Sequence, residues 1–303
     1  MFMDQANLSL IWWNTSLSPP INRKSETKNK FKHTRIDRIS YCTDVVQQFM
    51  DAGYDFICLG EVNSEDIKYI TEKTDIVESN YTFINGFEKA GGLIFDTCIL
   101  FKKSNKLNAD ASQVRNLTYS VSGRNIKVAQ RFEFFVSSIG ETIVLYLSHW
   151  PSNQSADDKV YQGIAQDLRR AVNNDLLYKT SHIVLLGDYN VEPHHTSMVE
   201  GLQASREKDL VIYRKSLLYN PCWKFLTRSQ SHPVNGDKAS TYYLRKTGLF
   251  NSWHMIDQVL ISHNFLTNAW NFKDSFVEII DTDTALNDPI SDHLAISIFI
   301  ERA

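Results

Sequence analysis

Cysteine, glycine and proline are scarce in this sequence of 303 residues, with 4, 12 and 7 copies respectively. The four cysteines show no CxxC spacing, which excludes a disulfide scaffold and a cysteine zinc site and predicts reduced thiols in the cytoplasm. The longest unbroken apolar run, 143–147, has five residues. A membrane-spanning helix needs roughly 20 such residues, so the sequence predicts no membrane span.

Other features are also missing. The sequence shows no signal-peptide pattern, no internal repeat and no linker rich in proline, glycine or serine. Its formal net charge is only −3, which argues against a general DNA-coating protein. Apolar residues make up 43% and charged residues 22%, as in ordinary globular proteins. We therefore expect a single cytoplasmic domain over residues 1–303, although the length alone would also allow two domains.

Apolar runs bounded by turn residues predict the β-strands. These runs cover residues 8–14, 55–61, 93–102, 126–136, 141–149, 182–188, 240–244, 255–262 and 293–301. The tight Ser-Ile-Gly turn between 126–136 and 141–149 requires that these two strands pair antiparallel.

Apolar residues at helical spacing predict two helices. The first covers residues 36–50 and ends near Gly53. The second covers residues 160–176, with Ser155 as its cap and two aspartates in its first turn. Because helices alternate with some strands while other strands form hairpins, we expect an α/β fold of mixed sheets with helices outside.

Polar side chains stand at the ends of several predicted strands. Asp188 and Asn190 lie two residues apart and point to one side, at the strand end where open α/β sheets bind ligands. Taken alone, this segment is equally well interpreted as a hydrogen-bonded turn. The pattern recurs, and buried unpaired polar groups are costly, so either each group has a local partner or they converge on one site. The recurring residues are Asn14, Glu61, His149, Asp257, Asp292 and His293.

In this order along the chain, these residues resemble the endonuclease/exonuclease/phosphatase superfamily, also called deoxyribonuclease-I-like. The segment GDYN (187–190) resembles its GD-aromatic-N motif, and SDH (291–293) resembles its C-terminal SDH motif. LGE (59–61) and SHWPS (148–152) stand at similar positions. The resemblance spans residues 8–301. It implies a four-layer sandwich, two mixed β-sheets packed face to face with helices on both outer faces, and a divalent metal, Mg²⁺ or Mn²⁺, at one rim.

The resemblance also implies roles for single residues. Mg²⁺ prefers oxygen ligands, and Glu61 is the first candidate ligand, with Asn14 and Asp292 beside it. The alternative for Glu61 is a salt bridge at the rim of the sheet. Asp188 would orient and deprotonate the attacking water, while Asn190 would fix that water or donate to the phosphoryl group.

Two histidines complete the implied site. His293 would contact a non-bridging phosphoryl oxygen, with Asp257 holding its tautomer. Because Asp292 and His293 are adjacent, both reach one site only if a turn intervenes, which Pro289 and Ser291 permit. His149 resembles the histidine of the deoxyribonuclease-I, sphingomyelinase and inositol-phosphatase branches.

Further residues have both a site role and a simpler alternative. Asp96 would orient His149, unless it is a solvent-facing strand residue. Arg124 resembles a phosphate-contacting arginine of the nuclease branch, and surface decoration is its alternative. Thr241 lies in a segment that often reaches the site in this superfamily, although β-branched residues in a strand need no function. Trp12 and Trp13 are interpreted as core packing rather than as a base-stacking platform.

Residues 19–36 carry six basic residues against one acidic residue, Glu26. Since this segment follows Asn14, it would leave from the metal rim and track a polyanionic backbone. A solvated loop is an equally good interpretation. The basic residues are Arg23, Lys24, Lys28, Lys30, Lys32 and Arg35.

These inferences predict a Mg²⁺-dependent phosphodiesterase, an endonuclease or exonuclease that hydrolyses DNA or RNA. The alternative is a phosphatase or phospholipase-type enzyme on a small or lipid phosphate, such as an inositol phosphate or a cyclic phosphate. A binding module without activity is disfavoured because no expected site position carries an inactivating residue. Nucleic acid or a small phosphoester is the expected partner, and no partner protein is predicted.

Overall fold

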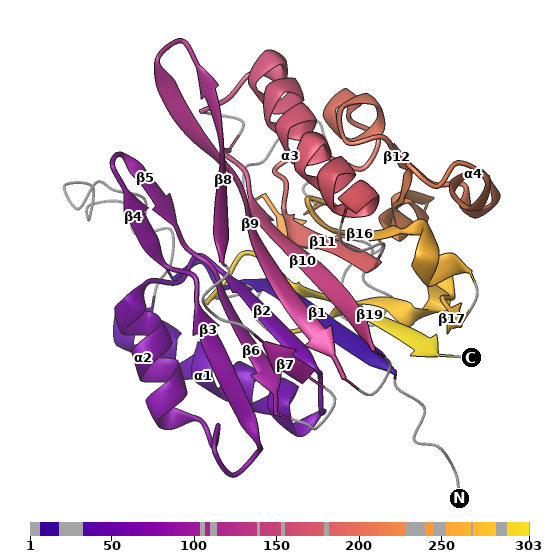
Figure 1. Ribbon diagram of the computed structural model, residues 1–303. Coiled ribbons are helices and arrows are strands. Elements are labelled where there is room, and N and C mark those ends of the chain that lie inside the picture. Colours follow the sequence, from indigo (N-terminus) through magenta and orange to yellow (C-terminus); the bar gives the residue numbers. More distant parts are fainter. Residues whose placement is uncertain are drawn as a thin grey trace, which may run out of the picture.

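A computed structural model of the chain describes residues 7–17, 33–103, 107–109, 114–137, 140–152, 155–178, 182–227, 240–244, 253–267, 269–282 and 290–302. Its strands form two large sheets, packed face to face with helices on both outer faces (Figure 1). Each sheet contains parallel and antiparallel pairs. The predicted four-layer α/β sandwich is therefore confirmed.

The first sheet has seven strands, and its centre is made by β1, β2 and β19. β1 pairs parallel with β2 and antiparallel with β19, so Asn14 at the end of β1 lies opposite Gly60 at the end of β2. The strand order is β17 (Trp270–Asn271), β19 (Ala295–Arg302), β1 (Leu8–Asn14), β2 (Phe56–Gly60), β6 (Cys98–Lys102) and β3 (Tyr81–Asn85), with β18 (Val277–Ile280) on β19.

The second sheet has eight strands. Its register pairs His149 with Asp188 across the parallel strands β10 and β11, and Asp188 with Asp257 across the antiparallel strands β11 and β16. Three residues of the predicted site therefore stand in one row. The strand order is β12 (Ala204–Ser205), β13 (Leu218–Tyr219), β16 (Asp257–Ser262), β11 (His182–Asp188), β10 (Glu141–His149), β9 (Arg124–Val136) and β7 (Leu107–Ala109), with β8 (Arg115–Val121) on β9.

Strand alternation divides the apolar side chains into three layers of core. Trp12, Leu145 and Leu147 point between the two sheets. Trp13 points to the opposite side of β1, where it packs with the helices of the first sheet, and Tyr146 points from β10 toward α3. Each sheet is thus buried on both faces, which explains why the strands read as nearly continuous apolar runs.

The helices cover the outer faces. α1 (Arg35–Asp51) begins at a capping box between Thr34 and Asp37. Residue Asp157 rather than the predicted Ser155 caps α3, because its Oδ1 accepts the Val160 N–H at 2.9 Å. α3 spans Asp158–Tyr178, and α2 (Ser64–Lys73) is a further helix that was not predicted. The remaining helical segments are α4 (Lys208–Tyr213) and the short helices Ser197–Gly201, Pro221–Thr227, His263–Leu266 and Asp274–Phe276.

The prediction of one strand over 93–102 is wrong. Asp96 and Thr97 separate β5 (Leu93–Phe95), which forms a hairpin with β4 (Glu88–Ala90), from β6 of the first sheet. The run 240–244 is also shorter as a strand, since only β14 (Tyr242–Tyr243) pairs there, with β15 (Trp253–His254). In both places the backbone bonds to neighbouring segments: Asp96 accepts the Val62 N–H at 3.1 Å, and Thr241 accepts the Leu294 N–H at 2.7 Å.

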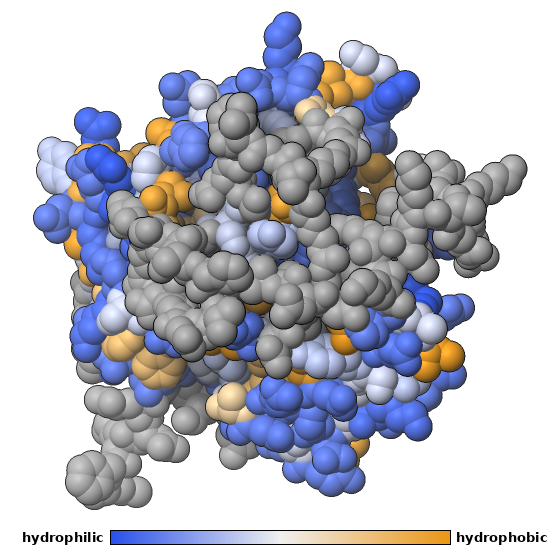
Figure 2. All heavy atoms as spheres, turned by 180° about the vertical axis from the view of Figure 1, so that it is seen from behind, coloured by the Kyte–Doolittle hydropathy of each residue, from blue (hydrophilic) through white to orange (hydrophobic). Residues whose placement is uncertain are grey.

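The surface and the helices agree with the absence of long apolar runs. Within the described ranges, no helix combines the length and apolarity needed to cross a bilayer. On the face turned away from Figure 1, hydrophilic side chains cover most of the described surface and hydrophobic ones are scattered (Figure 2).

Candidate active site

The candidate active site lies where β1 and β2 of one sheet and β10 and β11 of the other end. Asn14, the last residue of β1, is fully buried. Its Nδ2 donates to Glu61 Oε1 and to Asp188 Oδ2, at 3.1 Å in each case. One amide therefore joins carboxylates from the two sheets, and these carboxylate oxygens lie within twice that distance of each other.

Asp188 is fixed by the turn that follows β11. A side chain on Gly187 would place its Cβ 2.1 Å from the Ser148 carbonyl oxygen, so only glycine fits there. Asp188 Oδ1 accepts the Asn190 backbone N–H at 2.8 Å, and Asn190 Nδ2 donates to the Trp150 carbonyl at 2.9 Å. GDYN is therefore a hydrogen-bonded turn, and that turn holds the carboxylate toward Asn14.

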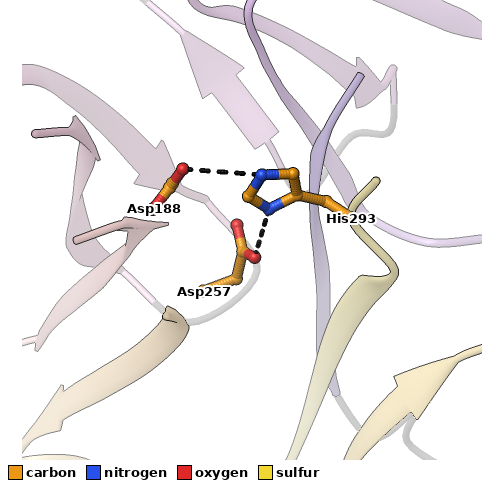
Figure 3. A group of neighbouring side chains, drawn as sticks. All are labelled: Asp188, Asp257 and His293. Carbon is orange, nitrogen blue, oxygen red and sulfur yellow. Dashed lines mark hydrogen bonds and ion pairs between the residues drawn. The ribbon is translucent and has the colours of Figure 1, made fainter. Parts of the chain in front are cut away.

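His293 and Asp257 form a buried pair beside Asp188 (Figure 3). His293 Nδ1 lies 2.7 Å from Asp257 Oδ2, and His293 Nε2 lies 3.8 Å from Asp188 Oδ2. Asp257 Oδ1 accepts the Trp12 indole N–H at 2.8 Å. Both oxygens of Asp257 thus have partners, so its carboxylate orients the histidine ring.

A bend at Asp292 brings this residue and His293 to the same site. Ser16 Oγ donates to Asp292 Oδ1 at 2.8 Å, and the same Oδ1 lies 4.0 Å from His293 Nε2. Ser291 Oγ donates to the Asn14 carbonyl at 2.8 Å. The two ends of the chain, 14–16 and 291–293, are therefore bonded to each other at the site.

Arg38 of α1 strengthens this junction from outside. Its Nη2 donates to the Ser16 carbonyl, and its Nε donates to the Ile290 carbonyl at 3.0 Å. Arg35, one turn earlier, donates to the Leu17 carbonyl at 2.5 Å. These arginines hold the segments that carry Asn14 and Asp292 against the first helix.

His149 and Asp96 form a second pair, on the opposite side of Glu61. His149 Nδ1 lies 3.1 Å from Asp96 Oδ2, and His149 Nε2 lies 3.5 Å from Glu61 Oε1. Lys127 joins the pair, because its Nζ donates to Asp96 Oδ1 at 2.6 Å and lies 3.1 Å from His149 Nδ1. Lys127 was not among the predicted site residues.

A β-bulge in β9 turns Lys127 into the site. In β8, Leu117 pairs with Ala129 and the next residue, Thr118, pairs with Lys127, so Val128 is the extra residue of the bulge. As a result, both Val128 and Ala129 pack toward α3. Arg124 shares the outward face of Ile126, which packs in that same layer, and is exposed near the hairpin turn. The structure therefore places Lys127, and not Arg124, next to the histidine.

Non-glycine residues with left-handed backbone gather at the site. Ser16, Glu61 and Asn190 have φ of 53°, 56° and 54°. Asparagine adopts this region readily, whereas glutamate does so at a cost of order 1–3 kcal/mol. The fold holds Glu61 in this conformation at the end of β2, where its carboxylate meets Asn14 and His149.

Asp188 and His293 both have raised pKa values. Burial and the neighbouring Asp257 raise the pKa of Asp188, against the opposite effect of the histidines. Burial lowers the pKa of His293, but Asp257, Asp188 and Asp292 outweigh burial and raise it well above its usual value. Among its carboxylates His293 is therefore held as a cation, while Asp188 is more basic than an exposed aspartate.

The second pair is balanced by the lysine. Burial and Lys127 lower the pKa of His149, while Asp96 and Glu61 raise it, and the net shift is upward. Burial raises the pKa of Asp96, but Lys127 and His149 hold it well below its usual range. Asp96 is thus firmly ionised and shared between two donors.

The donor set suits a hard divalent cation. Three possible ligand atoms lie within 4.8 Å of one another, one each from Asp188, Asp257 and His293. Glu61 and Asp292 add two carboxylates beside this group, because Asn14 Nδ2 joins Glu61 to Asp188 and Asp292 Oδ1 lies 4.0 Å from His293 Nε2. Asn14 differs from its predicted role here, because its Oδ1 accepts the Ser16 N–H at 3.0 Å and its Nδ2 faces the acids.

Other predicted residues lie outside this cluster. Thr241 is fully buried, and its Oγ1 accepts the Asp257 backbone N–H at 3.1 Å, so it supports Asp257 from behind. Lys28, Lys30 and Lys32 fall outside the described residues. Trp12 and Trp13 are core residues as predicted, at 0% exposure, but their indole N–H groups also reach Asp257 and the His293 carbonyl.

Comparison with known proteins gives one family. The profile described as "Endonuclease/Exonuclease/phosphatase family" matches residues 16–288. No curated protein matches the chain. The match ends just short of Asn14 on one side and of the SDH segment on the other, and the structure brings these two segments together.

Solved structures share the fold at low identity. The Danio rerio TDP2 complexed with a single-stranded DNA product is 16% identical, with a TM-score of 0.60 over 97% of this chain and 99% of that one. The human Nocturnin catalytic domain with bound sulfate is 16% identical, with a TM-score of 0.60 over 98% and 95%. A Bacteroides thetaiotaomicron mannosyl-6-phosphatase is 15% identical, with a TM-score of 0.63 over 97% and 99%.

Proposed function

Because the chain belongs to the endonuclease/exonuclease/phosphatase family, we propose that it is a divalent-metal-dependent phosphodiesterase that hydrolyses DNA or RNA. The observation that carries this proposal is the Asn14 amide, which joins Glu61 to Asp188 while a histidine approaches each carboxylate. Carboxylates, an amide and two oriented histidines around one point are the groups that phosphoester hydrolysis requires.

In the proposed reaction, Asp188 takes a proton from the attacking water as the new P–O bond forms. Asn190 holds Asp188 through its backbone N–H. His293, oriented by Asp257, donates to a non-bridging phosphoryl oxygen. The ester P–O bond breaks on the opposite side, and the leaving oxygen takes its proton from His149, whose ring is held by Asp96.

Mg²⁺ or Mn²⁺ is the proposed cofactor. Glu61 and Asp292 would hold it, and the bound cation would offset the negative charge of the phosphoryl oxygens. The half-buried Glu61 side chain is 22% exposed, so it has access to solvent as well as to Asn14.

A polynucleotide is supported by the basic sequence 19–36 together with the described residues Leu17 and Arg35. Arg35 donates to the Leu17 carbonyl, and the adjoining Ser16 donates to Asp292. The sequence between them carries five further basic residues. Basic residues that follow Asn14 and Ser16 in the sequence would attract a phosphate backbone.

The test is a turnover screen of the wild type and Asp188→Asn, with Mg²⁺ and with EDTA. The substrates are plasmid DNA, single-stranded DNA and RNA, inositol phosphates and phospholipid vesicles. We expect cleavage of a polynucleotide with Mg²⁺ only, lost in Asp188→Asn and kept in Asp209→Asn, which removes an exposed carboxylate of α4. No hydrolysis of any phosphoester by the wild type would refute the proposal.

A phosphatase acting on a small or lipid phosphate is the second candidate. Lys127 favours it, because an additional cation beside His149 suits the second negative charge of a phosphomonoester. The fold likeness to a mannosyl-6-phosphatase is compatible with this candidate. In the same screen, release of inorganic phosphate from small monoesters without polynucleotide cleavage would replace the first candidate by the second.

A further inference from the structure

The buried indole of Trp12 connects the two sheets beneath the candidate active site. Trp12 belongs to β1 of the first sheet and Asp257 to β16 of the second, and both are 0% exposed. Trp12 Nε1 donates to Asp257 Oδ1 at 2.8 Å, while Asp257 Oδ2 lies 2.7 Å from His293 Nδ1. The carboxylate therefore has one oxygen for the indole and one for the histidine.

Gly60 leaves the space that the indole occupies. A Cβ on Gly60 would lie 2.6 Å from Cη2 and 2.8 Å from Cζ2 of Trp12, closer than real Cβ contacts allow. Gly60 directly precedes Glu61, so the segment that carries this carboxylate is also the wall behind the indole. The ring is thus confined between Gly60 and Asp257.

We propose that Trp12 is a positioning residue for the reaction proposed above, acting through Asp257. A carboxylate has two equivalent oxygens and rotates freely unless one of them is fixed. With Oδ1 fixed on the indole N–H, Oδ2 faces His293 Nδ1. This fixes the orientation of the imidazole ring, with Nε2 toward Asp188. The inference depends on the proposed function, because positioning matters only if the site turns over.

The first test is Trp12→Phe, which keeps an aromatic ring in the core and removes the donor. We expect kcat to fall ten- to hundredfold with KM within twofold. In an Asp257→Asn background the same substitution should change kcat by less than twofold, because the Asp257 carboxylate through which Trp12 acts is already absent. A loss of kcat that persists in that background would overturn the proposal.

Trp270→Phe is the matched control. Trp270 is also buried, and its indole also donates to a carboxylate, Glu141 Oε2 at 3.2 Å. Trp270 lies in β17 at the edge of the first sheet, where it pairs with Arg302 at the far end of β19 from His293. Trp270→Phe should lower thermal stability as much as Trp12→Phe does and leave kcat unchanged. Equal kcat losses in the two variants would mean that only core packing was affected.

A second measurement does not require turnover. In ¹H–¹⁵N NMR spectra, the low-field Nδ1–H signal of His293 should move upfield or disappear in Trp12→Phe and stay in place in Trp270→Phe. If Trp12→Phe does not fold, the Trp12 indole N–H signal is measured in Asp257→Asn instead. This signal should shift relative to the wild type. An unchanged signal would overturn the positioning role, whereas a wild type without turnover would refute only the proposed function.

Discussion

His293–Asp257 and His149–Asp96 are two pairs with the same chemical groups in different surroundings. The first is sealed, with side-chain exposures of 6% and 0%, and has carboxylates and an indole around it. The second is more open, at 18% and 10%, and includes Lys127. In the sealed pair, carboxylates hold His293 as a charged donor, whereas in the more exposed pair Lys127 offsets the carboxylates around His149.

The largest effect should come from Asp257→Asn. An amide presents an N–H₂ group where the carboxylate accepts two hydrogen bonds, so it would leave the indole or the His293 ring without its acceptor. It would also remove the negative charge that raises the pKa of His293. We expect kcat/KM on the best substrate to fall roughly 10³- to 10⁴-fold, as for similar changes in histidine–aspartate pairs. Circular dichroism would establish that the variant is folded.

Asp96→Asn should have a smaller effect. The remaining carbonyl oxygen can still accept from Lys127, and Lys127 still contacts His149. We expect a loss of about 10- to 10²-fold in kcat/KM, at the lower end of the contribution of general acid–base catalysis. If the losses in Asp96→Asn and Asp257→Asn were equal, the contrast between the open and the sealed pair would have no functional meaning.

Lys127→Met removes the cation that distinguishes the second pair. One charge-assisted hydrogen bond is lost, and we expect kcat/KM to fall about tenfold, which corresponds to about 1.4 kcal/mol. The loss should be larger on a phosphomonoester than on a diester, and Lys127→Arg should restore part of it. Lys89→Met, at an exposed lysine of β4, is the control and should have no effect on turnover. Identical losses on both ester types would show that Lys127 does not respond to the additional charge of a phosphomonoester.

The basic segment should affect binding more than chemistry. Neutralising three of its lysines should weaken polynucleotide binding severalfold and reduce the slope of log affinity against log salt by roughly 2 to 3. Hydrolysis of a small diester should stay nearly unchanged. An unaltered salt slope would remove the segment from the binding surface. The substituted residues are Lys28, Lys30 and Lys32, and the control set is the exposed lysines Lys68, Lys73 and Lys103.

The smallest effect concerns a histidine–carboxylate pair at the other end of β11. His182 Nε2 lies 3.3 Å from Glu141 Oε2, but burial lowers the pKa of His182. Below about pH 6.5 the unfolded chain therefore binds more protons than the folded one, and stability falls as the pH drops. Between pH 7.5 and 5.5, His182→Gln should lose a few °C less in Tm than the wild type. An equal loss would contradict the lowered pKa.

The sequence was sufficient for the layers of the fold and for most residues that meet at the site. Continuous apolar runs mark the buried strands, and polar residues at their ends mark the active edge. The prediction of one strand over 93–102 was wrong because apolar residues stand on both sides of Asp96 and Thr97. At these two residues the chain passes from the β4–β5 hairpin to the first sheet. The ten-residue helix α2 was missed because few of its residues are buried.

Lys127 and Trp12 show where sequence reasoning ends. The side of β9 on which Lys127 lies depends on a bulge at Val128, which shifts the alternation and leaves no clear mark in the sequence. Trp12 looks like any core aromatic residue until the packing of the two sheets places its N–H against Asp257. Both roles depend on contacts between sheets, which strand periodicity does not encode.

We propose that Glu61 and Asp292 hold one divalent cation beside Asn14 and Asp188, between the two sheets. Anomalous diffraction from Mn²⁺-soaked crystals is the sharpest test of this site. We predict one strong peak within about 2.5 Å of a Glu61 carboxylate oxygen, absent from crystals of Glu61→Gln. A peak elsewhere, or none at saturating Mn²⁺, would contradict the claim.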